Sequence, residues 1–432
     1  MKIMVLGGGG REHAVVHAFS KSRITTELHC CPGNPGIAKL AHCHSGDSCN
    51  PEQMTALCKE LGIELVFVGP EAPLVVGTAD ALRDAGILVM GPGASGARLE
   101  GSKAFSKKFM KKHGIPTSAF DLCLNLDDCR EALRRRTAPY VVKADGLAAG
   151  KGAFLPESYE EAVETCRMML EEQKLGTAGN LIVVEDYVQG MEMTVLAFTD
   201  GKTVRILPSS QDHKRALDGD KGGNTGGMGA YSPVPWVDEA FMKKVTDEVL
   251  TPTVEGLKED GIKFCGVIYA GIMIKPDGSL SVLEYNVRLG DPETQVVLPA
   301  FGGDFGEAVL ACAKGELEKA DWPGANKVAL GVVMASGGYP AEYEKGMIIT
   351  GADKATSPEE EASTFVYHAG TRLGEKGELL TNGGRVLTVV GMADDLQTAR
   401  DRAYDRVAEI TFNGEHHRND IGDKSLKKKQ GE

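Results

Sequence analysis

The sequence lacks a long hydrophobic segment and an excess of positive charge. The apolar stretch at its start, residues 1–6, is too short for a signal peptide, and no later run reaches the about 18 apolar residues of a membrane-spanning helix. The formal net charge of -13 argues against nucleic acid or an anionic membrane as the main partner. We therefore expect a cytoplasmic protein with no nucleic-acid and no membrane partner, in which any anion site is built locally.

The ten cysteines include no C-x-x-C pair, which is the spacing common in redox and zinc sites. In a large cytosolic chain such cysteines are most simply free thiols. Cys30, Cys31 and Cys43, together with His42 and His44, could form a zinc site, but their spacing matches no usual structural pattern.

The composition is that of a soluble globular α/β protein, with 42% hydrophobic and 25% charged residues. Its 432 residues correspond to about three domains. Short buried-type strands alternate with helices over residues 1 to about 100, which predicts a doubly wound domain with a parallel sheet. Three strands between residues 328 and 390 and a helix at 394–411 predict a small, mostly β C-terminal domain, and residues 425–432 a flexible tail.

Glycines follow the first predicted strand, from Gly7 to Gly10, and a helix begins directly after them. This arrangement suits a phosphate, because glycine lets the main chain approach the anion and the helix start favours negative charge. The candidates are the amides of Gly9 and Gly10 and the side chain of Arg11, although a plain strand-to-helix turn fits the same pattern. The third glycine of a G-x-G-x-x-G motif is missing, so NAD is disfavoured. Glu71, after a later strand, is a candidate for binding a hydroxyl or an amine.

Several lysines of the central region are candidates for phosphate binding. Lys143 interrupts a strand that otherwise reads as core, and because an unpaired buried ammonium is costly we expect it to have an anionic partner. Lys103, at the start of a basic helix, is a second candidate, while the lysines after it are interpreted as a solvated face: Lys107, Lys108, Lys111 and Lys112. Lys151 lies in a glycine-rich loop that is not a Walker A loop, and it could bind phosphate or lie on the surface.

Two further segments carry polar residues in unusual places. Glu185 ends a predicted strand, and the open main chain after it suits an adenine, with Glu192 near enough to bind ribose hydroxyls. The long glycine-rich loop over residues 209–229 includes Asp212 and Lys214, and its charges are too varied for a linker. Loops of that length are usually functional or disordered.

The densest polar pattern lies at residues 279–295. Val282, Glu284, Asn286 and Arg288 recur at period two, which places them on one face if the segment is a strand. A carboxylate and an amide oxygen so close together suit Mg²⁺, which takes its remaining ligands from water and substrate phosphates. Arg288 would point into the same space, as a fork for phosphate or carboxylate. A half-exposed strand with a polar face in water remains an alternative.

These motifs, taken together, resemble the phosphoribosylamine-glycine ligase (glycinamide ribonucleotide synthetase) family of the ATP-grasp superfamily. The resemblance runs from residue 1 to about 422 and is carried by residues 8–14, 68–74, 99–103, 143–152, 210–215, 224–233 and 290–295. It implies a phosphoribosylamine domain at 1–102, a two-part ATP-grasp domain at 103–325 with a mobile lid at about 120–190, and a β-rich domain at 326–424.

The resemblance also implies roles for individual residues. Lys103, Lys143 and Lys151 would bind ATP phosphates, the main chain near Tyr187 and Val188 the adenine, and Glu185 and Glu192 the base and ribose. Glu284 and Asn286 would bind Mg²⁺ (or Mn²⁺), and Arg288, Lys143, Asp212 and Lys214 would be catalytic. The substrate-binding set would be Gly9, Gly10, Arg11, Glu71, Asp212, Arg288 and Pro292.

The reaction implied is the ATP-dependent ligation of glycine to 5-phosphoribosylamine in de novo purine biosynthesis, through glycyl phosphate, by a monomer or weak homodimer. Ile272, Met273 and Ile274 stand where many ATP-grasp enzymes have a further metal-binding acid, which leaves the metal count open. The alternatives are a related ATP-grasp carboxylate-amine ligase with a different carboxylate substrate, and a nucleotide-sensing protein that binds Mg-ATP without turnover.

Overall fold

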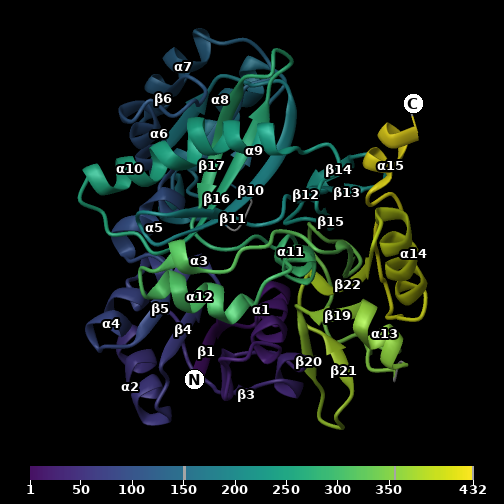
Figure 1. Cartoon of the computed structure of the whole chain (residues 1–432). Coiled ribbons are helices and arrows are strands. Elements are labelled where there is room, and N and C mark those ends of the chain that lie inside the picture. The colour runs from purple at the N-terminus through teal and green to yellow at the C-terminus, as the bar shows by residue number, and fades with distance from the viewer. Residues whose placement is uncertain (149–151, 355–356, 431–432) are drawn as a thin grey trace.

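The computed structural model describes residues 1–148, 152–354 and 357–430. Its N-terminal part is a five-stranded parallel sheet in the order β3-β2-β1-β4-β5 (Figure 1). The strands are β1 (Lys2–Gly7), β2 (Glu27–Pro32), β3 (His42–Cys43), β4 (Leu65–Val68) and β5 (Leu88–Met90), and the helices are α1 (Gly10–Ser20), α2 (Pro51–Leu61), α3 (Glu71–Val75), α4 (Thr78–Asp84) and α5 (Ala94–Gly101). The strand order reverses between β1 and β4, so the loops after these two strands border the crevice in which open α/β sheets bind ligands.

The middle of the molecule is a four-stranded antiparallel sheet, in the order β11-β10-β16-β17. Its strands are β10 (Met191–Thr199), β11 (Val204–Ile206), β16 (Gly266–Ile274) and β17 (Leu280–Asn286). Three consecutive helical segments follow one another before β16: α9 (Glu239–Val245), the π-helical turn η3 (Thr246–Leu250) and α10 (Thr251–Glu259). Val245, Val249 and Leu250 pack on Ile268 and Ala270, so this helical run covers one face of the sheet (Figure 1).

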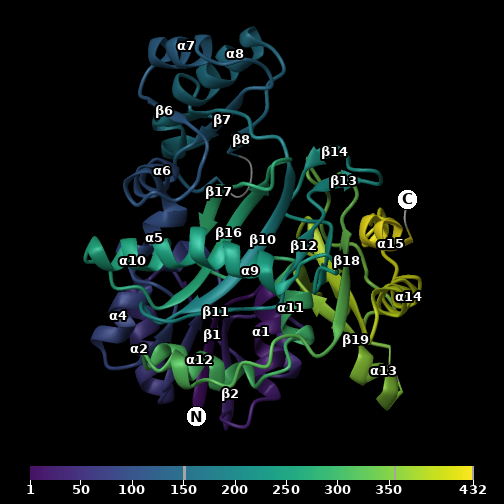
Figure 2. The same cartoon turned by 45° about the horizontal axis from the view of Figure 1, so that its top comes forward.

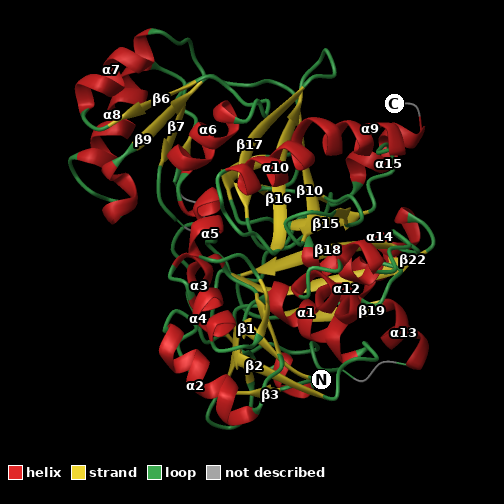
Figure 3. Ribbon diagram, turned by 60° about the vertical axis from the view of Figure 1, so that its left-hand side comes forward, coloured by secondary structure: helices red, strands yellow, loops and turns green. Residues whose placement is uncertain are grey.

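The predicted lid region forms its own sheet, in the order β6-β9-β7-β8, and stands apart in Figures 2 and 3. Its elements are β6 (Phe120–Cys123), α7 (Leu126–Arg134), β7 (Val141–Ala144), β8 (Ala153–Phe154), α8 (Tyr159–Leu170) and β9 (Ile182–Glu185), and α6 (Lys103–Lys112) leads into it. Leu133, Val142, Cys166 and Val184 belong to a separate hydrophobic core. A separate core is what a subdomain needs in order to move as a unit.

A third large sheet, in the order β12-β15-β18-β22-β19, joins distant parts of the chain. Its strands are β12 (Gln211–Asp212), β15 (Gly229–Ser232), β18 (Val328–Ala335), β19 (Thr364–His368) and β22 (Arg385–Ala393), with β20 (Thr371–Leu373), β21 (Leu379–Thr381), α11 (Thr294–Ala300), α12 (Phe305–Ala313), α13 (Pro358–Ser363) and α14 (Leu396–Val407) around it. A domain boundary at residue 325 therefore divides this sheet between β15 and β18. Chain order alone does not reveal this pairing.

A helix overlaps residues 425–432, the segment predicted as a flexible tail. This helix, α15 (Asp423–Gln430), continues to the end of the described part of the chain. Ser425 is buried, and its Oγ lies 2.6 Å from the hydroxyl of Tyr231, so tertiary contact holds the start of this helix.

All ten cysteines are free thiols, which confirms the prediction. Among the helices of the described residues, none has the length and apolar character of a membrane span.

Candidate active site

A β-bulge in β17 sets the direction of the predicted metal ligands. Gly271 pairs with Glu284 and Ile272 with Val282, so Leu283 has no partner on β16. Val282 is buried in the core, whereas Leu283 and Glu284 both line a cleft. The prediction that Val282 and Glu284 share one face was therefore wrong. The extra residue between them shifts the alternation of side chains between the two faces of the strand. Asn286 lies on the cleft side with Glu284, as predicted.

The cleft has a volume of about 490 Å³ and lies where the N-terminal domain, the lid, the central sheet and the C-terminal sheet meet. Nine of the predicted site residues line it: Arg11, Glu71, Lys103, Glu185, Asp212, Lys214, Glu284, Asn286 and Arg288. Charged residues of both signs come together here from six separate segments that are far apart in the sequence. Lys151 lies outside the described residues.

Glu284 is held in its ionised form. Burial alone would raise the pKa of this carboxyl, but the positive charges of Lys214, Lys143 and other cleft cations outweigh burial and lower its pKa below the ordinary value. An ionised carboxylate beside the Asn286 amide oxygen offers two hard oxygen ligands, which suits Mg²⁺ better than zinc. The described residues contain no group of three or more His, Cys, Asp or Glu placed to hold a metal by themselves. The remaining ligands would thus come from phosphates and water.

Two glutamates hold Arg288, just beyond the end of β17. Its Nη2 lies 2.7 Å from Glu100 Oε1, and its Nε lies 3.5 Å from Glu71 Oε2. Nη2 also donates to Asn286 Oδ1 at 3.0 Å. Glu100 accepts the main-chain N–H of Val287 at 2.8 Å, which fixes the turn that carries Arg288. Sequence reasoning assigned no role to Glu100, because a lone acid in a helix has no distinguishing pattern.

The expected anionic partner of Lys143 is Glu185, at 3.0 Å, which confirms that prediction. Lys143 Nζ also donates to the main-chain oxygen of Leu283 at 3.2 Å, beside Glu284. Glu185 is buried, forms a second ion pair with Lys107 and accepts a hydrogen bond from Ser118, so each carboxylate oxygen lies against an ammonium group. The interpretation of Lys107 as part of a solvated face was wrong: its side chain is only 2% exposed. Periodicity did not reveal this, because α6 contains five lysines.

The segment after β9 remains open for a ligand. Tyr187 and Val188 lie between β9 and β10, outside any strand, and no main-chain hydrogen bond forms at either residue within the described part of the chain. At the start of α6, the main-chain N–H of Lys103 donates to the main-chain oxygen of Asp145 at 3.0 Å. The side chain of Lys103 lines the cleft, whereas Tyr187 and Val188 are not among its lining residues.

Lys214 and Asp212 face the cleft from the glycine-rich loop. Lys214 forms an ion pair with Glu192. Burial alone would lower the pKa of Lys214, but Tyr269, Glu192 and Glu284 together raise it well above the ordinary value. Burial and the nearby charge of Glu293 raise the pKa of Asp212, although Lys214 opposes them. The loop therefore presents a firmly charged ammonium next to a carboxyl with increased proton affinity.

Close packing explains the glycines of this loop. Gly227 has φ of +112°, and a Cβ built there would lie 2.6 Å from Asp212 Oδ1 and would overlap Pro292. Arg385, from the C-terminal sheet, donates to the main-chain oxygens of Gly226 at 2.6 Å and of Asp291 at 2.7 Å. Arg385 lines the cleft and was missed by sequence reasoning, which saw only the first residue of a β-strand.

The predicted phosphate nest is partly occupied by a neighbouring side chain. The Gly9 N–H donates to Glu12 Oε2 at 2.7 Å, and Arg11 Nε donates to Glu12 Oε1 at 2.6 Å. Arg11 also donates to the main-chain oxygen of Leu289 at 3.1 Å. Only Arg11 of this nest lines the cleft. An anion bound at Gly9 would have to replace the Glu12 carboxylate, which the sequence did not indicate.

Three models of adjacent domains match the chain: the phosphoribosylglycinamide synthetase N domain over residues 1–100, its ATP-grasp (A) domain over 101–294 and its C domain over 329–424. The fold and cleft are thus those of an ATP-grasp enzyme. A phosphoribosylamine–glycine ligase of Streptomyces coelicolor is 46% identical, with 98% of this chain and 99% of that protein covered. One of Ralstonia nicotianae is 43% identical, with 99% and 100% covered. The chain belongs to the phosphoribosylamine–glycine ligase family and is an ATP-dependent carbon–nitrogen ligase of purine biosynthesis, as predicted.

Solved structures agree with this assignment. The phosphoribosylamine–glycine ligase of Thermotoga maritima is 34% identical, with a TM-score of 0.86 and coverage of 98% of this chain and 100% of that chain. The biotin carboxylase domain of Hydrogenobacter thermophilus 2-oxoglutarate carboxylase, solved with MgADP and bicarbonate, is 17% identical, with a TM-score of 0.73 and coverage of 96% and 91%. That second likeness extends to the fold alone. The predicted fold class is confirmed.

Proposed function

We propose that the cleft joins glycine to 5-phosphoribosylamine. The γ-phosphoryl group of ATP passes to a carboxylate oxygen of glycine, so that the bond to ADP breaks as the bond to glycine forms. The amine of phosphoribosylamine then attacks the carbonyl carbon of glycyl phosphate, and phosphate leaves as the carbon–nitrogen bond forms. The chain needs no nucleophile of its own, because positioning and charge neutralisation are sufficient for such transfers.

One observation carries this proposal: the Glu284 and Asn286 oxygens face the same cleft as the cationic side chains of Lys103, Lys214 and Arg288. We assign Glu284 and Asn286 to Mg²⁺ (or Mn²⁺), which when bound would neutralise charge on the β- and γ-phosphates. Lys103, Lys214 and Arg288 contact phosphoryl or carboxylate oxygens. Lys143, held by Glu185, supplies further positive charge beside Leu283.

In this proposal the nucleotide base lies against the main chain of Tyr187 and Val188. The N–H and C=O groups of these two residues form no main-chain hydrogen bond within the described part of the chain. Glu192 accepts ribose hydroxyls after exchanging its contact with Lys214. Glu185 was expected at the base. Its engagement with two lysines supports a role in holding Lys143 at the phosphates instead. Lys151 remains a candidate for the phosphates.

The amine substrate takes the side of the cleft formed by the N-terminal domain. Arg11 pairs with the substrate phosphate, Glu71 with a hydroxyl or the amine, and Gly9, Gly10 and Pro292 contribute main-chain and van der Waals contacts. Asp212 accepts the proton that the amine loses, because burial and the charge of Glu293 raise the pKa of this carboxyl and so increase its proton affinity. We place the enzyme in the cytoplasm, as a monomer or weak homodimer. We also propose that it has no nucleic-acid or membrane partner, which the net charge of -13 supports.

The test is a coupled assay of ADP release in which each substrate is left out in turn. We expect release only when Mg-ATP, glycine and phosphoribosylamine are all present. Release that is independent of glycine but dependent on another carboxylate would instead assign the chain to a related ligase. Binding of Mg-ATP without any turnover would contradict the proposal as a whole.

A further inference from the structure

A fully buried arginine lies in an irregular segment near the C-terminus. The side chain of Arg418 is 0% exposed, although no helix or strand contains it. A guanidinium removed from water is costly unless charges and hydrogen bonds compensate for it. Arg418 meets this requirement with a bidentate pair to Asp420, at 2.7 Å from Nε and 2.8 Å from Nη2. Its Nη1 is thereby left to point at another part of the chain.

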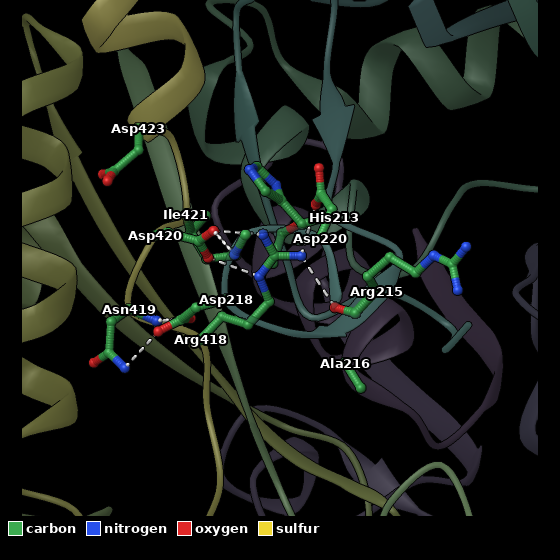
Figure 4. Close-up of polar contacts among 12 residues, drawn as sticks. His213, Arg215, Ala216, Asp218, Asp220, Arg418, Asn419, Asp420, Ile421 and Asp423 are labelled. Carbon is green, nitrogen blue, oxygen red and sulfur yellow. Dashed lines mark hydrogen bonds and ion pairs between the residues drawn. The ribbon is translucent and has the colours of Figure 1, made fainter. Parts of the chain in front are cut away.

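That other part is the hairpin of β13 (Arg215–Leu217) and β14 (Lys221–Asn224) (Figure 4). Nη1 of Arg418 donates to the main-chain oxygen of Arg215 and to Asp220 Oδ1, both at 3.0 Å. The same C-terminal segment binds the rest of the turn: Asn419 N–H donates to Asp218 at 2.8 Å, and the Gly219 N–H donates to Asp420 at 2.8 Å. We call residues 416–424 the strap.

The hairpin has little to hold it apart from the strap. Only two residue pairs connect its strands, with a register shift between them, and β14 is exposed throughout. Isolated two-stranded hairpins are at best marginally stable in water. His416 adds a contact to the main-chain oxygen of Ala216 at 2.8 Å. The position of the hairpin is therefore set mainly by a segment about 200 residues later in the sequence, as Arg418 and Asp220 are separated by 198 residues.

Both ends of the hairpin enter the cleft. Lys214 precedes β13, and Asn224, Thr225 and Gly226 follow or end β14; all four line the cleft. The main-chain oxygen of Lys214 accepts from the Thr225 N–H at 2.8 Å, which closes the base of the hairpin. A shift of the hairpin would therefore move the cleft-lining residues at both of its ends.

We propose that Arg418 is a positioning residue for the reaction: by fixing the β13–β14 hairpin it places the Lys214 ammonium and the main chain of residues 224–226 at the cleft. The proposal rests on the function proposed above for Lys214. Arg418 itself does not line the cleft among the described residues, so its effect on the cleft is indirect.

The test compares three variants with wild type. Arg418→Met removes both hydrogen bonds from Arg418 to the hairpin, and Asp220→Asn weakens only the hairpin side while the Arg418–Asp420 pair stays intact. Arg406→Met is the matched control, because Arg406 is a buried arginine of the same domain that donates to Gly351 and Ala352, away from the hairpin. We expect kcat to fall roughly tenfold to a hundredfold in Arg418→Met, and less in Asp220→Asn, because small misplacements of reacting groups have effects of this size. Arg406→Met should keep kcat within about twofold of wild type.

Two readouts separate positioning from general destabilisation. Hydrogen exchange of the amides at 215–224 should accelerate in Arg418→Met and Asp220→Asn but not in Arg406→Met. In a Lys214→Ala background, Arg418→Met should lower kcat by only about twofold, because its main route of action is already gone. If Lys214→Ala kept the kcat of the wild type, the role proposed for Lys214 would be contradicted. Hydrogen exchange at 215–224 would in that case still decide the role of Arg418. The proposal would be overturned if Arg418→Met showed the same kcat and the same hydrogen exchange at 215–224 as Arg406→Met.

Discussion

Lys107 and Glu185 form an ion pair of 2.7 Å in which each side chain is only 2% exposed. Lys143 approaches the other carboxylate oxygen at 3.0 Å, so one buried carboxylate lies between two ammonium groups. The group of three carries a surplus positive charge at the wall of the cleft. A negatively charged phosphate there would complete the pairing, which accounts for burying a second lysine that the fold alone does not require.

Replacing Lys107 by Met should weaken both folding and nucleotide binding. Glu185 would keep Lys143 as a partner, so we expect a loss of about 1–3 kcal/mol in the free energy of unfolding. KM for ATP should rise, because the surplus charge is lost. Denaturant unfolding and steady-state kinetics measure the two effects. Lys108→Met is the matched control, since Lys108 is the exposed neighbour and should change stability by no more than about 0.5 kcal/mol. Equal stability of the two variants would contradict the assignment.

The same lysine predicts a pH dependence of stability. Burial and the charge of Lys143 lower the pKa of Lys107 from 10.5 to about 8, although Glu185 opposes them. Between those values the unfolded chain holds a proton that the folded chain has released, and stability rises with pH wherever the unfolded state binds more protons. The wild type should therefore gain unfolding free energy relative to Lys107→Met from about pH 8 to pH 10.5, with little relative change below pH 7. Parallel pH profiles of the two proteins would show that Lys107 does not titrate in this range.

Residue type alone was enough to predict that Glu284 and Asn286 lie at one site and that Lys143 has an anionic partner, and the structure places the first two at the cleft and pairs Lys143 with Glu185. Glu284 and Asn286 stand out because polar residues interrupt an apolar strand, and Lys143 stands out for the same reason. The bulge at Leu283 could not be predicted, because it depends on pairing with β16 and leaves no mark in the alternation of polar and apolar residues in the sequence. Arg385 could not be found either, because its contacts with Gly226 and Asp291 exist only once the C-terminal sheet packs on the glycine-rich loop.

Glu284→Gln should reduce turnover by a factor of roughly a hundred or more, because it removes the ionised ligand at the phosphates. The side chain keeps its size, so the circular dichroism spectrum and melting temperature should stay close to those of wild type. Titration with Mg²⁺ should require a higher concentration for half-maximal activity, and chelation of divalent ions should abolish turnover in both proteins. Glu131→Ala, at an exposed position in α7, is the control. Undiminished turnover in Glu284→Gln would remove this residue from the metal site.

Gly227→Ala tests the close packing of the glycine-rich loop. The added Cβ would lie 2.6 Å from Asp212 Oδ1 and would overlap Pro292, so the loop must move away from the cleft. Positive φ adds strain of its own, and this part is measured by Gly261→Ala and Gly278→Ala, at φ of +71° and +77° with nothing within 4 Å of the new carbon. All three variants should lose stability by about 1 kcal/mol or more. Only Gly227→Ala should also lose activity, and a similar activity in all three would mean that the contact has no catalytic consequence.

Arg11→Ala tests the assignment of the N-terminal domain to the amine substrate. Arg11 reaches the cleft from the start of α1, next to the crevice between β1 and β4, whereas we propose that the nucleotide binds toward the lid. Loss of a charge-assisted contact to a phosphate should raise KM for phosphoribosylamine about tenfold or more, with KM for ATP unchanged. Arg11 also binds Glu12 and the main chain of Leu289, so the variant must be checked for folding by thermal unfolding. Arg23→Ala, an exposed arginine of the same domain, should leave both KM values unchanged. An increase in KM for ATP instead would reassign this side of the cleft to the nucleotide.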